Sequence, residues 1–377
     1  MTKLKEGLDE KLKALSPNLQ KKIFKEGKNS SMGMLSPVSK FLVNTKKHCN
    51  GGKTVDAGLW LKSHLDNDGK MFLTMSGAGS SFQMGILISE LIRKGKVHGI
   101  SVTGANMEES MYRYVAHSHY AYIPNYSELT PEEENELREV GLRRITDTFL
   151  PEEESVRKIL PALETLWRNA EEEGNKYLWH EYFFQLFERN LIKKDPEANE
   201  DDCWLYQAWK HKIPVSVPGF EDSTMGNIFT QMCYDGDHPF LSKYKLEKPI
   251  STTIVKPGFS YMHHLTEWYM DTSKDSPIAF LQLGGGISAD FPICVVPHIK
   301  HDYLEEIKDI KEKDKLVRPW AAFIEIHSSP MSFGSYSGAG FKEKITWDKF
   351  APDAFGLQIF GDYTEHFPDI AAIILGK

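Results

Sequence analysis

From residue 70 onward, short apolar runs alternate with segments of helical periodicity, and most runs end in a turn rich in glycine or serine. Apolar runs of this length between turn residues are typical of buried strands. They predict strands at residues 71–75, 97–102, 213–217, 278–283, 320–326 and 357–360. Residues 82–93 and 108–116 predict the first intervening helices. Strands that alternate with helices favour an α/β fold: one large, Rossmann-like, mostly parallel sheet covered by helices on both faces.

Two segments do not follow this alternation. Residues 1–35 alternate charged and apolar positions and predict an N-terminal helical arm, whereas residues 36–377 are expected to form the main domain. Within that domain, residues from about 129 to 201 are strongly acidic and predict a helical insertion. Two Pro-Glu-Glu-Glu runs, at 131–134 and 151–154, suit the first turn of a helix, where proline is tolerated and carboxylates face the positive end of the dipole.

Composition narrows the functional class. The chain has 377 residues, of which 41% are hydrophobic and 26% charged, as in an ordinary globular protein. A net charge of −8 disfavours a nucleic-acid partner but allows a small cationic substrate. The 4 cysteines form no CxxC pair and indicate reduced thiols. Neither a signal peptide nor an apolar run of membrane-spanning length occurs, so we expect a cytoplasmic protein with no membrane partner.

The turns after the strands are the candidate sites, because ligands of such sheets bind at the carboxyl ends of the strands. The first turn, Ser-Gly-Ala-Gly-Ser-Ser at 76–81, offers backbone N–H groups to a phosphate. Phe82 stands where the dinucleotide fingerprint needs a third glycine, so this turn equally suits a structural role. No nucleophile elbow, Walker loop or metal-binding histidine pattern occurs, and no metal is expected. Other candidate turns lie at residues 103–109, 221–226, 284–286 and 335–349, and Asp362 follows the last strand.

Taken in order, these turns resemble the deoxyhypusine synthase family, and more closely its bacterial deoxyhypusine-synthase-like branch. The resemblance extends from about Ser36 to the C-terminus and is most specific at residues 334–349, Gly-Ser-Tyr-Ser-Gly-Ala-Gly-Phe-Lys-Glu-Lys-Ile-Thr-Trp-Asp-Lys. It implies an NAD-dependent transfer of a 4-aminobutyl group from a polyamine, spermidine or putrescine, to an acceptor amine. NAD would take a hydride from the carbon beside the secondary amine of spermidine, giving an imine. Cleavage would release 1,3-diaminopropane, and a lysine would carry the butyl group as an imine. The acceptor then displaces the lysine, and NADH returns the hydride.

The resemblance also implies a role for each matching residue. Lys349 corresponds to the catalytic lysine, which must lose its proton to attack; burial beside Trp347 and a second cationic amine is expected to favour that loss. The expected substrate-binding residues are Glu109, Asn227, Asp290, Tyr336, Glu343 and Trp347. The expected NAD-binding residues are Gly77, Ala78, Gly79, Ser80, Ser81, Thr103, Gly104, Ala105, Glu108, Asp222, Gly285, Ser328, Ser329, Asp362 and Tyr363. The family further implies a homotetramer whose sites are shared between subunits.

Three positions depart from the protein-modifying members of the family. Asp290 stands where they carry a histidine, and Asn227 and Tyr336 stand where they carry aspartates. Because all three positions line the amine tunnel in the family, the changes bear on the acceptor more than on the chemistry. We expect putrescine as the acceptor, giving homospermidine, in preference to a protein lysine of a translation factor. A non-catalytic protein that binds NAD or polyamines is the third hypothesis, although such a protein need not keep Lys349.

Overall fold

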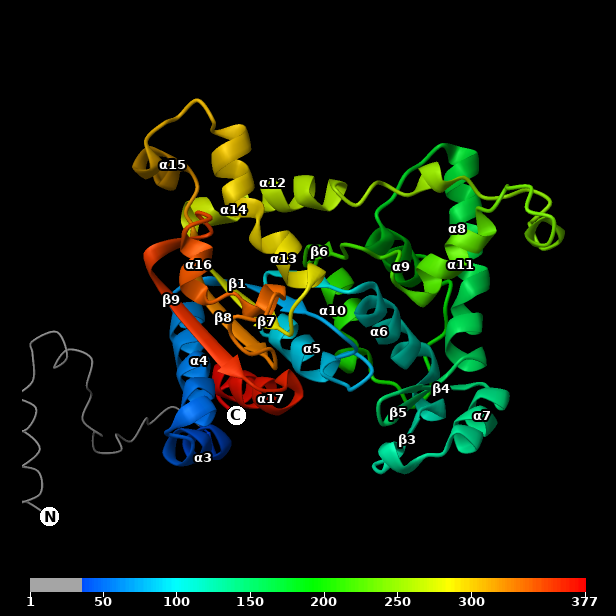
Figure 1. Cartoon of the computed structure of the whole chain (residues 1–377), viewed down its shortest axis with the longest axis horizontal. Coiled ribbons are helices and arrows are strands. Elements are labelled where there is room, and N and C mark those ends of the chain that lie inside the picture. The colour runs from blue at the N-terminus through cyan, green and yellow to red at the C-terminus, as the bar shows by residue number, and fades with distance from the viewer. Residues whose placement is uncertain (1–35) are drawn as a thin grey trace, which may run out of the picture.

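The computed structural model describes residues 36–377, so the predicted arm at residues 1–35 lies outside the described residues. At its centre is a six-stranded sheet in the order β6-β2-β1-β7-β8-β9, with every neighbouring pair parallel. The expected α/β fold with a parallel sheet is confirmed (Figure 1). Its strands are β1 (Lys70–Met75), β2 (Gly99–Val102), β6 (Val215–Ser216), β7 (Ile278–Leu283), β8 (Trp320–His327) and β9 (Phe350–Phe360).

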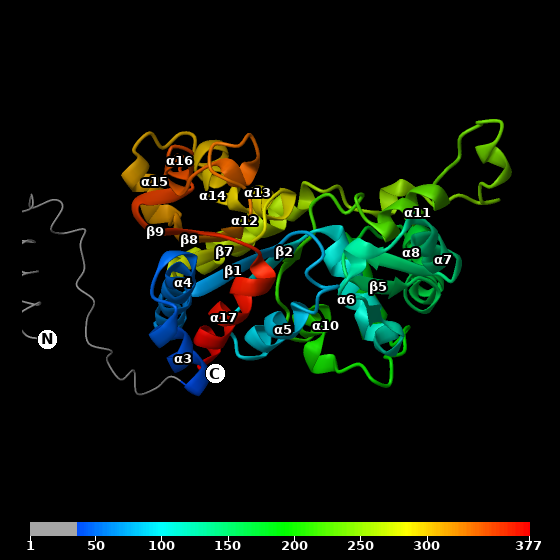
Figure 2. The same ribbon diagram turned by 60° about the horizontal axis from the view of Figure 1, so that its bottom comes forward.

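Helices cover both faces of the sheet, as Figure 2 shows. In β1, Met71 and Leu73 face one helical layer and Phe72 faces the other, because successive side chains of a strand point to opposite faces. The first layer contains α4 (Cys49–Asp66), α5 (Gly85–Arg93) and α17 (Tyr363–Leu375), with α3 (Pro37–Thr45) packed against it. The second contains α12 (Ser260–Asp275), α13 (Ile287–Ile293), α14 (Val295–His298) and α16 (Phe341–Ile345), and α15 (Ile310–Leu316) lies beyond it.

A lobe lies beside the sheet, next to β2 and β6, at the right of Figure 1. Its buried side chains continue the core of the first helical layer. A small antiparallel sheet in the order β3-β5-β4 forms one end of the lobe. The elements of the lobe are α6 (Gly104–Ala116), β3 (Ala121–Tyr122), α7 (Pro131–Glu139), β4 (Leu142–Ile145), β5 (Thr148–Pro151), α8 (Lys158–Glu173), α9 (Trp179–Glu188), α10 (Trp204–Lys210) and α11 (Thr224–Met232).

The acidic segment, predicted to be a helical insertion, is only partly helical. It contains α7, α8 and α9, and Thr130 forms a capping box with Glu133 at the first Pro-Glu-Glu-Glu run. The second such run, however, begins at Pro151, which ends β5 in a hairpin with β4. The connecting turn contains no glycine, and Thr146 within it adopts a φ of 55°. The sequence therefore carried none of the usual two-residue hairpin signals.

Helix starts also differ from the predictions. α5 begins at Gly85, because residues 77–84 form successive turns instead of the first helical turn. α6 begins earlier than predicted, at Gly104, where the hydroxyl of Thr103 caps the helix by accepting the N–H of Asn106 at 3.3 Å. These two starts lie at the carboxyl ends of β1 and β2, where the expected cofactor-binding residues lie.

One row of polar residues crosses the otherwise apolar sheet. The strand register aligns them in the order Ser216, Ser101, Thr74, Gln282, Glu325 and Gln358, one from each strand. The flanking residues Leu73, Leu281 and Ile324 point into the core of the first layer, so the polar row faces the second layer. Burying polar groups is costly unless they are hydrogen-bonded. The packing of the core alone therefore does not explain why this row is polar.

Candidate functional site

The glycine-rich turn after β1 forms a concave surface of backbone N–H groups. Gly77 adopts a φ of +65°, and the N–H groups of Gly77, Ala78 and Gly79 donate to no acceptor among residues 36–377. The side chain of Asn106 holds the turn, accepting the N–H of Ser80 at 2.9 Å and donating to the carbonyl of Gly77 at 2.8 Å. Successive unpaired N–H groups in this geometry bind anions such as phosphate.

The expected NAD-binding residues at the start of α6 divide into two environments. Thr103 lies beside the glycine turn, and its hydroxyl donates to the carbonyl of Gly77 at 3.1 Å. Glu108 instead points to the start of α11, where its carboxylate accepts the N–H groups of Thr224 and Met225, each at 2.9 Å. Glu108 is 2% exposed, so its carboxylate acts here as a cap of α11. Its role toward NAD stays a prediction.

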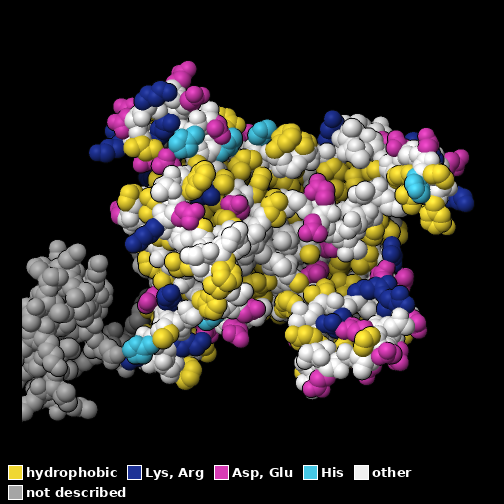
Figure 3. Space-filling model, in the orientation of Figure 1, with side chains coloured by type: hydrophobic (Ala, Val, Ile, Leu, Met, Phe, Trp, Pro, Cys, Tyr) yellow, Lys and Arg dark blue, Asp and Glu magenta, His cyan; other side chains and the backbone are white. Residues whose placement is uncertain are grey.

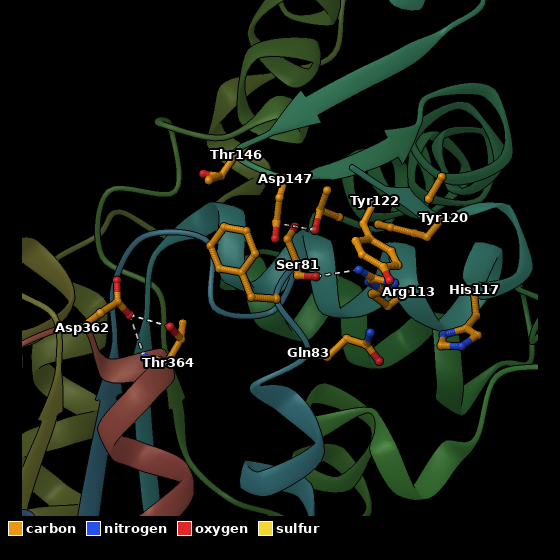
Figure 4. A pocket seen from close by; sticks show the side chains of 13 residues that line it. Ser81, Gln83, Arg113, His117, Tyr120, Tyr122, Thr146, Asp147, Asp362 and Thr364 are labelled. Carbon is orange, nitrogen blue, oxygen red and sulfur yellow. Dashed lines mark hydrogen bonds between the residues drawn. The ribbon is translucent and has the colours of Figure 1, made fainter. Parts of the chain in front are cut away.

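A cavity of about 630 Å³ separates the glycine turn from the small sheet. Figure 3 shows this face hollowed between α17 and the small sheet, with acidic and basic side chains intermixed around the hollow. In Figure 4, Asp362 and Thr364 lie on one side of the cavity and Arg113 and Tyr122 on the other. The carboxylate of Asp362 accepts the N–H and the hydroxyl of Thr364, both at 2.7 Å, and so caps α17.

Beneath this cavity lies a cluster of buried polar groups with few partners. Ser81 Oγ, Glu109 Oε2, Arg113 Nε and Tyr120 Oη are buried and have no hydrogen-bond partner among the described residues. The Arg113 guanidinium lies 3.7 Å from the centre of the Tyr120 ring and donates to the carbonyl of Ser81 at 2.6 Å. Burial raises the pKa of Glu109 to about 7. Such groups are rarely left unpaired in a folded protein, so the cluster indicates a ligand or bound water here.

A second cavity, of about 360 Å³, lies at the carboxyl ends of β7, β8 and β9. The triple-glycine turn forms one wall, and a Cβ atom at Gly285 would lie 2.2 Å from the hydroxyl of Ser337. Tyr363 closes the cavity toward β1 by donating its hydroxyl to the carbonyl of Ser76 at 2.9 Å. Asp362 lines both cavities. The expected NAD-binding residues found here are Gly285, Ser328, Ser329, Asp362 and Tyr363.

Lys349 lies at the opposite end of its strand from these turns, since it directly precedes β9. It is 8% exposed, and its Nζ lies 3.7 Å from Asp290 Oδ1 on α13. Asp348 adopts a φ of 55°, which turns the chain so that Lys349 donates its N–H to the carbonyl of Lys344 at 3.3 Å. The carboxylate of Asp348 pairs with His301 at 2.9 Å. The catalytic lysine expected from sequence is therefore buried and held by a tight turn.

A second lysine that sequence reasoning missed lies next to Lys349. Lys344 is 3% exposed, and its Nζ lies 4.4 Å from the ring centre of Tyr336 and 5.0 Å from that of Phe323. Burial lowers the pKa of Lys344, the carboxylate of Glu325 opposes that shift, and the charge of Lys349 adds to it. Lys344 is thus a second cationic amine in the same segment as Lys349, and its part in the expected chemistry stays a prediction. An available signal was Glu325, a charged residue within an apolar strand.

The other expected substrate-binding residues are not all brought together in one chain. Tyr336 belongs to the Lys349 group, since its hydroxyl donates to Gln282 Oε1 at 3.2 Å in the polar row. Trp347 is 63% exposed beside Lys349, and Glu343 is exposed on α16. Asn227 is exposed on α11, which lies far from α16 in both Figure 1 and Figure 2. Asp222 is exposed just before α11.

The deoxyhypusine synthase family model matches residues 49–374. The chain belongs to this family. A probable deoxyhypusine synthase of Picrophilus torridus is 24% identical over 320 residues, covering 84% of this chain and 85% of the relative. A deoxyhypusine synthase-like protein of Nostoc is 23% identical over 332 residues, covering 87% and 78%. These nearly equal identities do not resolve the branch of the family, so the bacterial branch stays a prediction.

Among solved structures, the crystal structure of a putative deoxyhypusine synthase from Entamoeba histolytica matches with a TM-score of 0.49 and 12% identity. The match covers 90% of this chain and 88% of that one. No helix within residues 36–377 is long and apolar enough to cross a membrane. No group of 3 or more His, Cys, Asp or Glu side chains in the same part of the chain could hold a metal ion.

The residues of this deoxyhypusine synthase family member fit the NAD that the family uses. The unpaired N–H groups after β1 suit a pyrophosphate, and Asp362 is an acid placed between two cavities, as a ribose hydroxyl requires. Ser337 lies so close to Gly285 that no side chain fits there, so this wall of the second cavity consists of backbone. Backbone donors, hydroxyls and one acid are therefore gathered where the strands end, as a dinucleotide needs.

Proposed function

We propose that this protein is an NAD-dependent aminobutyltransferase that carries a 4-aminobutyl group as an imine on Lys349. One observation carries the proposal: Lys349 is buried, 3.7 Å from the carboxylate of Asp290 and beside a second buried lysine, in a chain of the deoxyhypusine synthase family. A buried lysine beside a carboxylate is placed to attack a bound amine carbon, and the carboxylate can take up a proton during the exchange. When bound, NAD supplies reversible hydride transfer.

The chain's own residues bind and orient the amine. The carboxylate of Asp290 is the group nearest to Lys349 Nζ that can hold an ammonium or accept a proton during imine exchange. The exposed indole of Trp347 offers a face to an ammonium and to methylenes. Glu109 adds a buried carboxylate that ionises when a cation lies next to it. An amine that suits these groups is a chain of methylenes with charged ends.

We further propose putrescine as the acceptor, with homospermidine as the product. The departures at Asp290, Asn227 and Tyr336 support a small diamine, because the family enzymes that modify a protein lysine carry other residues there. Protein-lysine modification remains the second candidate, and a non-catalytic binding protein the third. The protein incubated with NAD, spermidine and putrescine should release 1,3-diaminopropane and form homospermidine, as followed by chromatography. Diaminopropane without homospermidine would instead point to a protein acceptor.

The Lys349→Ala variant tests the enzyme against the sensor hypothesis. It should lose turnover while retaining NAD and spermidine binding. Lys342→Ala is the matched control, since Lys342 is an exposed lysine of the same segment. Full activity in Lys349→Ala would contradict the imine on this residue. Wild-type protein that binds NAD and spermidine without cleaving the polyamine would favour the binding protein.

We also propose a homotetramer whose sites are shared between copies. The support is the separation of Asn227 on α11 from Lys349 before β9, which leaves the expected amine-binding residues divided within one chain. Lys349→Ala and Asn227→Arg should each be inactive as homo-oligomers. Co-expression of the two should restore part of the activity, because some sites then combine two intact halves. No restoration in isolated mixed oligomers would refute the shared site.

A further inference from the structure

The polar row of the sheet contains a buried carboxyl group, that of Glu325, which interacts electrostatically with Lys344. Glu325 is 0% exposed. Its carboxylate accepts the amide of Gln282 at 2.7 Å and that of Gln358 at 2.9 Å, and its Oε2 lies 3.6 Å from His327 Nε2. Burial raises the pKa of Glu325. A carboxylate in the middle of a sheet is costly to bury and is tolerated where a cation compensates it.

The compensating cation is Lys344, and its surroundings have an unusual composition. The ammonium makes no ion pair or hydrogen bond with any residue in the described range 36–377. It lies instead over the rings of Tyr336, at 4.4 Å, and Phe323, at 5.0 Å, within the field of Glu325. Two aromatic faces and a carboxylate are the groups that proteins use to bind a ligand ammonium. We call this set of Tyr336, Phe323 and Glu325 the ammonium recess.

We infer that Lys344 is a specificity-determining residue of the amine site, because its ammonium fills the ammonium recess and so denies that place to an ammonium group of the substrate. The recess adjoins the proposed amine site, since Lys344 lies near enough to Lys349 and Asp290 for their charges to influence its pKa. Tyr336 also extends from the recess to the wall of the second cavity. A polyamine with an additional ammonium at this end meets a fixed positive charge, whereas a shorter amine does not.

The recess can be tested without any turnover, by chemical rescue of Lys344→Ala with ethylammonium. Removing the side chain leaves the recess open and Glu325 uncompensated, so the thermal unfolding temperature should fall. Ethylammonium should then raise it with the logarithm of concentration, as expected for a ligand of the folded state. Ethanol at the same concentration lacks the charge and should not. Wild type and Lys344→Met, whose recess is filled, should not respond to either.

The specificity half of the inference rests on the proposed function and needs kinetics. For Lys344→Ala, the KM for spermine relative to that for spermidine should fall at least about tenfold, the effect of removing one close like charge. The relative kcat values should change much less. Lys342→Ala, which removes an exposed lysine of the same helix, should leave the ratio unchanged. Lys344→Met removes the charge but keeps the volume, and it carries the kinetic test if Lys344→Ala yields no folded protein.

The outcomes separate the two proposals. Rescue by ethylammonium together with inactive wild-type protein would uphold the ammonium recess and defeat the aminobutyl transfer. If the wild-type protein is active but ethylammonium raises neither the unfolding temperature nor the soluble yield of Lys344→Ala, the proposal that the recess binds an ammonium is overturned. Rescue with an unchanged spermine-to-spermidine ratio would overturn the role of Lys344 in specificity, because the recess would then lie outside the path of the substrate.

Discussion

If Glu109 binds the amine as proposed, it should make the stability of the free protein and the affinity for the amine respond oppositely to pH. Its pKa is raised from an ordinary 4.5 to about 7, chiefly by burial. The carboxyl is therefore about one-tenth ionised at pH 6 and about nine-tenths ionised at pH 8. An ammonium placed against Glu109 favours the ionised form, so amine affinity should rise about tenfold over this range. The Glu109→Gln variant cannot ionise and should bind more weakly, without this dependence.

The stability of the ligand-free protein depends on pH in the opposite direction to the amine affinity. Because the folded state holds the proton of Glu109 more tightly than the unfolded chain, the contribution of this proton is fully present below pH 4.5. It is lost as the pH rises to about 7 and amounts to at most about 3 kcal/mol. Glu109→Gln removes this cost and should be the more stable protein at pH 8, as measured by urea unfolding. One substitution should thus stabilise the fold and weaken the complex.

Isothermal titration with putrescine in the presence of NAD measures the binding half of this prediction. Putrescine suits the assay because both its amines stay protonated between pH 6 and pH 8. Parallel titrations in two buffers of different ionisation enthalpy should reveal proton release near pH 7 in wild type and none in Glu109→Gln. Affinity that is flat with pH in wild type would refute the reasoning, and so would an equal slope in both proteins.

Three further changes test how the site and the fold are built. Gly285→Ala places a Cβ atom 2.2 Å from Ser337 Oγ and should weaken NAD binding at least about tenfold, as measured by fluorescence titration. Gly340→Ala is the control, because its Cβ atom meets nothing nearer than 3.9 Å, and it should leave NAD binding unchanged. Asp348→Gly relieves the strain of the positive φ but loses the pairing with His301, so the free energy of unfolding should change by no more than about 1 kcal/mol. Asp348→Val is strained at that φ and should lower the free energy of unfolding by more. Burial and the charge of Lys70 lower the pKa of His98 to about 4, below the ordinary 6.5, so stability present above pH 6.5 is lost as the pH falls toward 4. The loss should be about 2 kcal/mol between pH 7 and pH 5 in urea unfolding, and His98→Asn should remove it.

The sequence pattern predicted the parallel sheet because each strand is a short apolar run closed by a turn. It did not predict the hairpin of β4 and β5, whose turn at Thr146 carries no glycine. Nor did it predict the early start of α6, which depends on the Thr103 hydroxyl reaching the N–H of Asn106. These features are decided by a local capping bond or by an unusual φ, and neither leaves a periodic trace in the chain.

For the site, the resemblance named Lys349 as the expected catalytic lysine but gave no reason to notice Lys344 or Glu325. Their proximity depends on the register of β7, β8 and β9, which aligns Gln282, Glu325 and Gln358 although they are distant in sequence. Glu108 shows the converse, since a residue expected to bind NAD is engaged by the start of α11. Register and tertiary capping therefore decide which polar residues are available to a ligand, and single-chain patterns do not contain that information.

The two groups of the site use different parts of the chain. In the proposed function, cofactor contacts come from the backbone of two turns, at Gly77, which has a positive φ, and at Gly285, where a Cβ atom would clash. Substitutions in these turns should therefore act through backbone strain and steric fit. The proposed amine site consists instead of side chains: Lys349 and Asp290, which pair with each other, and Lys344, which lies over Phe323 on the face of the sheet that carries the polar row. Charge changes there leave the glycine turns untouched. If the proposed function holds, substitution of a few charged side chains should consequently change amine selectivity without altering the proposed cofactor site at the strand ends.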